Sequence, residues 1–180
     1  MSMQRRHFLR QLCAVTLTWL GVGGCARSDK ANATSDEQGS SPIGKLNKPL
    51  SEWRQLLPPQ AYAVLFEEAT ERPGSSPLNH EKREGTYICA ACSLPLFESA
   101  TKFDSGTGWP SFFQPIPDHI ETKTDYKLIF PRTEYHCARC GGHQGHVFDD
   151  GPPPTGQRWC NNGVALNFVP TGESLPALRT

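Results

Sequence analysis

The feature that most constrains this chain is a set of four cysteines arranged as two C-x-x-C pairs, Cys89 with Cys92 and Cys137 with Cys140. Two such pairs can place four thiolates at the corners of a tetrahedron, which suits zinc and leaves no open coordination position. The pairs are separated by 44 residues, whereas a simple zinc ribbon has about 15–20. A shared metal would therefore join two distant segments, and the chain between them must belong to the same domain.

Two other uses of these cysteines are open. Outside the cytoplasm disulfides persist, and the four residues could form two bridges. One pair could instead be a redox-active C-x-x-C, but that motif prefers a strand-to-helix junction in a βαβ unit, a pattern that this sequence lacks. We favour zinc as the interpretation.

The composition restricts the class of protein further. Among 180 residues, 18 are basic and 18 acidic, so bulk charge gives no support for a nucleic acid or an anionic membrane surface as partner. The hydrophobic fraction is 37%, and glycine and proline contribute 16 residues each. This composition favours a compact, turn-rich, mostly β protein over a bundle of long helices.

The folded part is expected at residues 45–170, followed by a C-terminal tail at 171–180. Apolar residues about one turn apart predict two short helices, and β-rich runs bounded by turn residues predict strands. The predicted helices are 49–57 and 60–68, and the predicted strands are 86–88, 126–130, 134–136 and 164–169. The sequence therefore predicts short strands with helices at the N-terminal end of the domain.

Residues 1–25 have the pattern of an export signal. Arg5 and Arg6 precede Phe8 and Leu9, and an apolar run of about 13 residues follows at 12–24. That run is too short to span a bilayer, and the paired arginines resemble the twin-arginine signal that a receptor reads. A basic N-terminus without a targeting role is the alternative. Export would make the protein periplasmic or otherwise extracytoplasmic.

The processing site has two candidates. Cys25 follows Val22-Gly23-Gly24 and resembles the lipidated cysteine of a bacterial lipobox, whereas Ala31-Asn32-Ala33 offers an ordinary small-x-small cleavage site. Residues 26–44 are polar and free of aromatic side chains, so we expect a flexible tether there. Contact with a membrane is expected only through the signal or a lipid on Cys25.

Cys160 remains once the paired and signal-region cysteines are set aside. Arg158 precedes it by two residues and lies on the same face if the segment is a strand, and a nearby cation lowers the pKa of a thiol. Polar, turn-prone residues follow at 161–163. The alternative is a buried, inert cysteine, but this neighbourhood predicts an exposed and activated thiol.

Two further groups of residues accompany Cys160. His143 and His146 lie in the glycine-rich segment GGHQGHVFDDGP, and imidazole transfers protons readily near pH 7. Surface imidazoles or additional zinc ligands are the alternatives. Trp109 precedes a proline and would be either a core tryptophan or a wall for a methyl or thioether group, since sulfur contacts aromatic rings favourably.

Together the segments CAAC–LPLF, KFDSGTGWPSF, CARCGGHQGHVFDDGP and RWCNNGVALNF resemble the methionine-R-sulfoxide reductases of the B type. The resemblance covers about residues 46–169. It implies a mainly β fold of antiparallel sheets with short N-terminal helices, in which a structural zinc ion on Cys89, Cys92, Cys137 and Cys140 joins the halves. It also implies reduction of the R epimer of methionine sulfoxide to methionine.

The resemblance assigns roles by motif position. Cys160 would be the nucleophile that becomes a sulfenic acid, and Arg158 would hold it as a thiolate. His146 and His143 would supply protons to the departing oxygen, and Asn162 would orient that oxygen or a water. Trp109 would hold the substrate's methyl group, with Phe168 lining the same pocket.

This chain departs from the family at Thr107, where many members carry a resolving cysteine. The resemblance then implies recycling of Cys160 by a small thiol or by a thioredoxin-like partner through a mixed disulfide. Cys25 on its tether is a less favoured resolving thiol. Methionine sulfoxide in oxidised proteins is the expected substrate, and a monomer is expected.

Two rival functions are weighed against the reductase. A zinc-containing binding module is one, although it gives Cys160, His143 and His146 no shared purpose. A thiol–disulfide oxidoreductase that uses a C-x-x-C pair is the other, and one bound metal with one reactive thiol would exclude it.

Overall fold

The computed structural model describes residues 43–127 and 130–180. The predicted export signal and most of the predicted tether lie outside these residues. Within them, no helix is long and apolar enough to cross a membrane. The predicted tail, 171–180, lies against the body of the domain, since Arg139 donates a hydrogen bond to the carbonyl of Arg179 (2.6 Å) and Arg179 N–H donates to Cys92 (3.1 Å).

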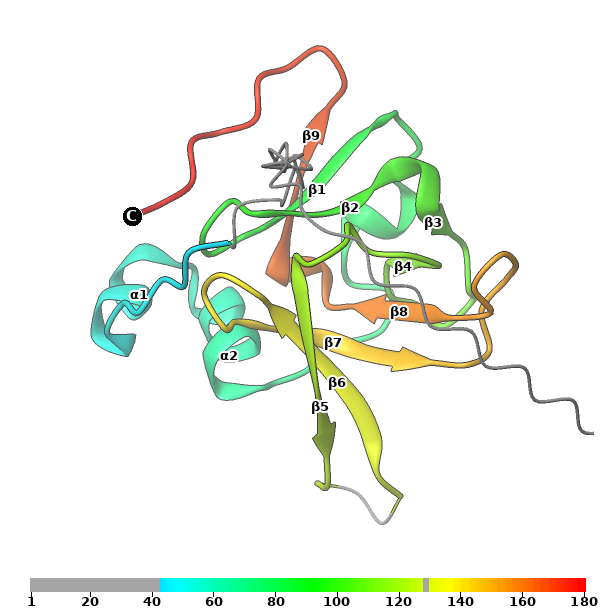
Figure 1. Cartoon of the computed structure of the whole chain (residues 1–180), viewed down its shortest axis with the longest axis horizontal. Helices are drawn as coiled ribbons and strands as arrows, with labels where there is room; N and C mark the ends of the chain where they lie inside the picture. The colour runs from blue at the N-terminus through cyan, green and yellow to red at the C-terminus, as the bar shows by residue number, and fades with distance from the viewer. Residues whose placement is uncertain (1–42, 128–129) are drawn as a thin grey trace, which may run out of the picture. The chain divides into compact units, whose positions relative to one another are not determined.

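Two antiparallel sheets form the domain, as the sequence predicted (Figure 1). The smaller sheet has the order β2-β1-β9, and its strands are β1 (Gly85–Cys89), β2 (Pro95–Glu98) and β9 (Leu166–Pro170). The larger has the order β3-β4-β8-β7-β6-β5. Its strands are β3 (Lys102–Phe103), β4 (Ser111–Phe112), β5 (Ile120–Asp125), β6 (Arg132–Cys137), β7 (His143–Phe148) and β8 (Arg158–Asn161).

The two predicted helices are present near the N-terminal end of the described chain, as α1 (Leu50–Leu56) and α2 (Pro59–Glu67). Proline at the first position of α2 suits the helical φ and lacks only an N–H that would be unpaired there. Helix α2 packs against β7 and the 3-10 turn η3 (Gly163–Ala165). A side chain at Gly142 would begin 2.8 Å from Leu65, so this close approach requires glycine. The other 3-10 turns are η1 (Pro77–His80) and η2 (Ser99–Thr101).

Aromatic side chains from both sheets fill the space between them. Phe112 of β4 is fully buried, stacks on Phe97 of β2 with ring centroids 4.2 Å apart, and meets Tyr87 of β1 edge-on at 4.9 Å. Tyr135 of β6 also meets Phe97, and Trp159 of β8, edge-on. These contacts hold the smaller sheet on the inner face of the larger one.

One strand prediction was wrong and others were incomplete. Residues 126–130 were predicted as a strand, of which 128 and 129 lie outside the described residues. The other three are not in a strand, because β5 ends at Asp125, whose side chain accepts a hydrogen bond from the backbone N–H of Lys127 (2.8 Å) and starts a turn. Tyr126 and Phe130 are 75% and 80% exposed beside that turn. The glycine-rich segment after Cys140 proves to be the central strand β7, and the first residues of 164–169 form η3 instead of strand.

Replacing Phe112 with alanine is expected to lower the free energy of unfolding by about 3–5 kcal/mol, because the cavity would lie at the centre of the inter-sheet core. Chemical denaturation of the full chain measures this loss. Phe130→Ala is the matched control, since that side chain is exposed and its removal should change stability by less than about 0.5 kcal/mol. Equal effects of the two substitutions would contradict the described core.

Candidate metal centre and active site

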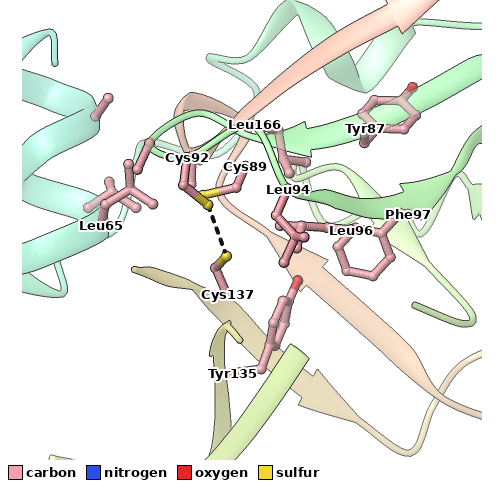
Figure 2. Packing of buried hydrophobic residues seen from close by; sticks show 14 of the residues in the cluster. Leu65, Tyr87, Cys89, Cys92, Leu94, Leu96, Phe97, Tyr135, Cys137 and Leu166 are labelled. Atoms are coloured by element: carbon pink, nitrogen blue, oxygen red, sulfur yellow. Dashed lines mark hydrogen bonds between the residues drawn. The ribbon is translucent and has the colours of Figure 1, made fainter. Parts of the chain in front are cut away.

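The four paired cysteines converge on one point between the two sheets. Figure 2 shows three of them, Cys89, Cys92 and Cys137. Cys89 Sγ lies 3.7 Å from Cys140 Sγ, and Cys92 Sγ lies 3.5 Å from Cys137 Sγ. All four sulfur atoms are within 4.8 Å of one another. A tetrahedral ion with metal–sulfur bonds of about 2.3 Å places its ligands about 3.8 Å apart, whereas a disulfide requires about 2.05 Å. The arrangement therefore fits a four-thiolate metal site.

Each pair is presented by a tight turn at the end of a strand. Cys89 ends β1, and its N–H and carbonyl bond to Leu94 and Ser93; Cys137 ends β6, and its N–H and carbonyl bond to Gly142 and Gly141. Because β1 belongs to the smaller sheet and β6 to the larger, an ion on these ligands would join the sheets.

The protonation of these thiols also points to a cation. Hydrogen bonds from the neighbouring thiols lower the pKa of Cys92, whereas those contacts together with burial raise the pKa values of Cys89 and Cys140. Four adjacent thiols cannot all ionise by themselves, since each thiolate disfavours the next. A divalent cation would supply the charge that allows it.

Gln144 links this cysteine cluster to the neighbouring pocket. It is fully buried, its amide N–H donates to Cys89 Sγ (3.5 Å), and its amide oxygen accepts from Asn161 (3.4 Å). Its backbone carbonyl accepts from both the backbone N–H (2.8 Å) and the side chain (3.0 Å) of Asn162. Gln144 of β7 thereby connects Asn161 and Asn162, which follow Cys160, to the cysteine cluster through hydrogen bonds.

The period of two in the strands gathers the predicted site residues on one face of the larger sheet. In the register, His146 of β7 lies opposite Cys160 of β8, and Phe148 lies opposite Arg158. The alternate residue Trp159 points into the core. A side chain at Gly145 would begin 1.9 Å from the carbonyl oxygen of Cys160, so only glycine lets β7 approach this closely.

A bulge accounts for the position of His143. The register between β6 and β7 shifts so that Tyr135 pairs with Gly145 while His136 pairs with His143, which leaves Gln144 as the extra residue. Two histidines three apart on a regular strand would face opposite sides. Here their rings lie 5.5 Å apart and the Gln144 side chain turns into the core.

A small cavity of about 120 Å³ lies beside Cys160. Of the predicted site residues, Cys160, His146, Trp109 and Asn162 line it, and Thr70, Arg132, Gly145, Phe148 and Asn161 complete the wall. Cofactor pockets are usually about 300–1,000 Å³. The cavity therefore suits the end of one side chain and is too small for an organic cofactor.

Three predicted residues do not line the cavity: Phe168, His143 and Arg158. Phe168 packs on Tyr87 (centroids 4.9 Å apart) and under Arg83 in the smaller sheet, so the structure does not bring it to the pocket. Phe148 is the phenylalanine that lines the cavity. His143 lies behind His146 and is 2% exposed, so it can act on the pocket only through its neighbour.

A loop that the sequence did not single out fixes the wall of the pocket. Trp109 donates its indole N–H to the carbonyl of Glu71 (3.2 Å), and Asn162 accepts from the backbone N–H of Glu71 (3.0 Å). The Glu71 carboxylate in turn accepts from Gly163 (2.6 Å) and Val164 (3.0 Å). Both the oxygen and the NH2 group of the Asn162 side chain thus bond to backbone groups, so Asn162 positions the loop that contains Glu71.

The electrostatics at Cys160 differ from the sequence expectation. Burial raises the pKa of its thiol, while Arg158 and a hydrogen bond with Thr107 oppose that rise. Arg158 is only 8% exposed, and its guanidinium is paired with both oxygens of Asp150 at 2.7 and 2.9 Å. This ion pair offsets part of the arginine's charge, so the effect of burial outweighs that of Arg158 and the pKa of the Cys160 thiol remains raised.

His146 is oriented by a carboxylate that pattern reading did not identify. Its Nε2 lies 2.9 Å from Asp125 Oδ2, which also bonds Arg132 (2.6 Å). The backbone N–H of Lys127 and the bond to His146 lower the pKa of Asp125, so the carboxylate is ionised and Nε2–H donates to it. This fixes the tautomer of His146 and leaves Nδ1 as its second site for a proton.

The fold and this pocket define a mainly β protein with four cysteines clustered closely enough to hold a metal ion and a further cysteine at a small cavity, and residues 57–170 match the family model described as the SelR domain. The chain is 56% identical over 129 residues to the peptide methionine sulfoxide reductase MsrB of a Pseudomonas putida strain, covering 70% of this chain and 96% of that protein. Proteins of the same name from Bradyrhizobium diazoefficiens (53% over 127 residues, 70% and 91% covered) and Methanosarcina barkeri (51% over 124 residues, 68% and 87% covered) are similar. The chain therefore belongs to the MsrB family of peptide methionine sulfoxide reductases.

The buried histidine predicts a pH effect on stability. Burial first, then the neighbouring His136 and His146, lowers the pKa of His143 to about 4. The unfolded chain binds a proton at this residue below about pH 6.5 and the folded chain does not, so stability falls as pH drops from 7.5 to 5. We expect His143→Gln to lose about 2 kcal/mol less over that range than the natural sequence.

Denaturant titrations at a series of pH values measure this difference. His80→Gln is the matched control, since His80 is exposed and its removal should leave the pH slope unchanged. Parallel slopes for the natural chain and His143→Gln would contradict a buried, neutral His143.

Proposed function

We propose that this protein reduces the R epimer of methionine sulfoxide, in oxidised proteins, to methionine. The observation that carries the proposal is the register of β7 and β8, which sets Cys160 opposite a histidine already bonded to a carboxylate, at the wall of a small pocket. The names of the relatives support the same reaction.

The pocket supports a substrate that ends in a methyl sulfoxide. Trp109 and Phe148 supply aromatic faces for the methyl and sulfur, while Cys160 and His146 lie on the same wall. Arg132 also lines the pocket, and its Nε has no hydrogen-bond partner within residues 43–127 and 130–180.

The proposed chemistry transfers one oxygen atom. The Cys160 thiol gives its proton to His146 as its sulfur attacks the sulfoxide sulfur, and His146 passes the proton to the sulfoxide oxygen. In this adduct the hydroxyl group moves from the substrate sulfur to the Cys160 sulfur, and the bond between the two sulfur atoms breaks with its electron pair left on the substrate sulfur. Methionine is released and Cys160 becomes a sulfenic acid. Cysteine is thereby oxidised by two electrons and the sulfoxide reduced by two, so no further proton is required in this half-reaction.

Regeneration of Cys160 consumes two thiols. The first thiol displaces water from the sulfenic acid and forms a mixed disulfide, and the second releases Cys160 as the thiol. Thr107, where the family resemblance implies a resolving cysteine in many members, shares a hydrogen bond with Ser105 (2.8 Å) and lies close enough to Cys160 to oppose the rise in its pKa. We propose that a small thiol or a thioredoxin-like protein supplies both equivalents.

The ion at the cysteine cluster is proposed to be zinc, since four thiolates at these separations match its tetrahedral preference. When bound, it would hold the sheets together and take no part in catalysis, because four protein ligands close its coordination. Cys89, Cys92, Cys137 and Cys140 would be those ligands.

Export is proposed from the N-terminal sequence. The paired Arg5 and Arg6, the apolar run and the polar residues after it support a twin-arginine-type signal, with Cys25 as a possible lipid-bearing residue. The domain would then act as a monomer outside the cytoplasm.

Separated epimers test the reaction. The full chain with excess dithiothreitol is expected to reduce only the R epimer of a blocked methionine sulfoxide, and Cys160→Ser should lower that rate at least 1,000-fold, because a serine hydroxyl is a far weaker nucleophile (about three to six orders of magnitude are lost on removing such a nucleophile). Cys25→Ser is the matched control and should keep the natural rate. A folded protein that turns over neither epimer would leave the binding-module interpretation in its place.

The substitution Thr107→Cys tests whether a thiol at position 107 would react with the sulfenic acid on Cys160. After one turnover without reductant, the natural chain is expected to lose one free thiol, whereas Thr107→Cys should lose two, because the introduced thiol lies beside Cys160 and condenses with the sulfenic acid. Thiol titration under denaturing conditions provides the count. Thr101→Cys is the control and should behave like the natural chain; a loss of two thiols in the natural chain would indicate a native resolving cysteine.

Metal analysis of the natively purified full chain is expected to give one zinc per polypeptide. Cys140→Ser should release it and lower the melting temperature by roughly 10 °C or more, since metal binding to such a site contributes to folding. Cys160→Ser should retain the zinc. A stable, metal-free natural chain, or full zinc in Cys140→Ser, would refute the assignment.

A further inference from the structure

Glu134, His136 and His143 form a second group of side chains that could ligate a metal ion, and none of the three lines the cavity at Cys160. Their ligand atoms lie within 4.8 Å of one another, on the β6–β7 hairpin. We propose that these three residues form a reversible site for a second divalent zinc ion and that occupation of this site inhibits the reductase. The inhibition rests on the proposed function, whereas the binding does not.

The distances require little rearrangement. Glu134 Oε2 lies 3.1 Å from His143 Nδ1 and 3.8 Å from His136 Nε2. Zinc bonds of about 2.0–2.2 Å to nitrogen and oxygen place tetrahedral ligands about 3.4 Å apart. Both separations therefore differ from the distance between two ligands of one zinc ion by only a few tenths of an ångström.

The burial of the group leaves one donor unpaired. The side chains of Glu134 and His143 are 5% and 2% exposed. Within the described part of the chain, His143 Nδ1 has no hydrogen-bond partner, because the neighbouring carboxylate is close but poorly aligned. An unpaired buried polar atom is unfavourable, and coordination of an ion by this nitrogen would give it a partner.

An entry path exists on the side away from Cys160. A cavity of about 340 Å³ is lined by His136 and His143 together with Glu68 and Lys123. It can admit an ion with its waters, and these waters would fill the coordination position that three protein ligands leave open. Two imidazoles and one carboxylate favour zinc and related first-row ions over calcium or magnesium.

One charge opposes binding and keeps the site reversible. Lys123 Nζ lies 3.0 Å from Glu134 Oε1, but it also lies 2.9 Å from Glu68 Oε1, and its side chain is 54% exposed. Lys123 can therefore keep its pair with Glu68 when an ion takes Glu134. Its charge lowers the affinity relative to the four-thiolate site, so the two zinc ions differ in how readily they are removed.

The link to the reaction is electrostatic. His143 and His146 have ring centroids 5.5 Å apart. A divalent cation on His143 would stand next to the imidazole that must carry a proton in the proposed reaction, and like charges at this distance disfavour that protonated form. Occupation of the second site should therefore slow oxygen transfer without displacing the substrate.

The binding arm of the test uses the full-length Cys160→Ser chain loaded with one zinc, which removes the reactive thiol as a competing ligand. Titration calorimetry with zinc chloride is expected to show one further ion per chain. His136→Gln should weaken this second binding at least tenfold, and His80→Gln, the matched control, should leave it unchanged. No second ion, or a second ion that binds His136→Gln equally well, would overturn the site; circular dichroism and retention of the first zinc establish that each variant is folded.

The activity arm uses a single turnover of pre-reduced enzyme with the R epimer in the absence of thiols, since thiols bind zinc. The second equivalent of zinc should slow release of methionine at least fivefold in the natural chain and in His80→Gln, but not in His136→Gln. Binding without slower turnover would overturn the inhibition and leave the site. An enzyme inactive before zinc is added would instead refute the proposed function, which the binding arm does not depend on.

Discussion

The four-cysteine cluster is the interaction on which the rest of the structure depends. It is the point where the end of β1, in the smaller sheet, meets the end of β6, in the larger sheet. The aromatic core between the sheets is extensive, but apolar packing is non-directional and does not by itself fix one registration of two sheets. Ligands that must converge on one ion within a few tenths of an ångström do fix it.

The cluster also determines where the pocket lies. The Gln144 side chain donates a hydrogen bond to Cys89, and its backbone carbonyl accepts one from Asn162. The metal ligands, β7 and the residues after Cys160 are therefore connected by hydrogen bonds. The bulge that turns Gln144 inward is what brings His143 beside His146 on the outer face. One irregularity in β7 thus serves both the metal centre and the histidine pair.

Sequence reasoning predicted the class of fold and the cysteine cluster because each depends on residue type and short spacing. The role of Cys160 as nucleophile stays a prediction. Sequence reasoning could not predict the partners that come from other strands. Asp125 stands 21 residues before His146 and has no motif of its own, and Glu71 reaches Gly163 and Val164 across 92 and 93 residues.

Three differences from the sequence expectations have physical causes that only the structure reveals. Phe168 and Phe148 are equivalent by residue type, and strand pairing alone decides which of them shares a face with Cys160. Arg158 was expected to stabilise a thiolate, but its charge is committed to Asp150, and burial of the thiol prevails. A strand was expected at 126–130, but β5 ends at Asp125, whose side chain accepts a hydrogen bond from the backbone N–H of Lys127.

Hydrogen exchange of the backbone amides, with the ion bound and after its removal by a chelator, tests the central claim most directly. If the metal centre fixes β7 in the larger sheet, removal of the ion should reduce protection in His143–Phe148 and Arg158–Asn161 together with the turns at Cys92 and Cys140. Loss of protection in those two turns alone, with both strands fully protected, would contradict the account.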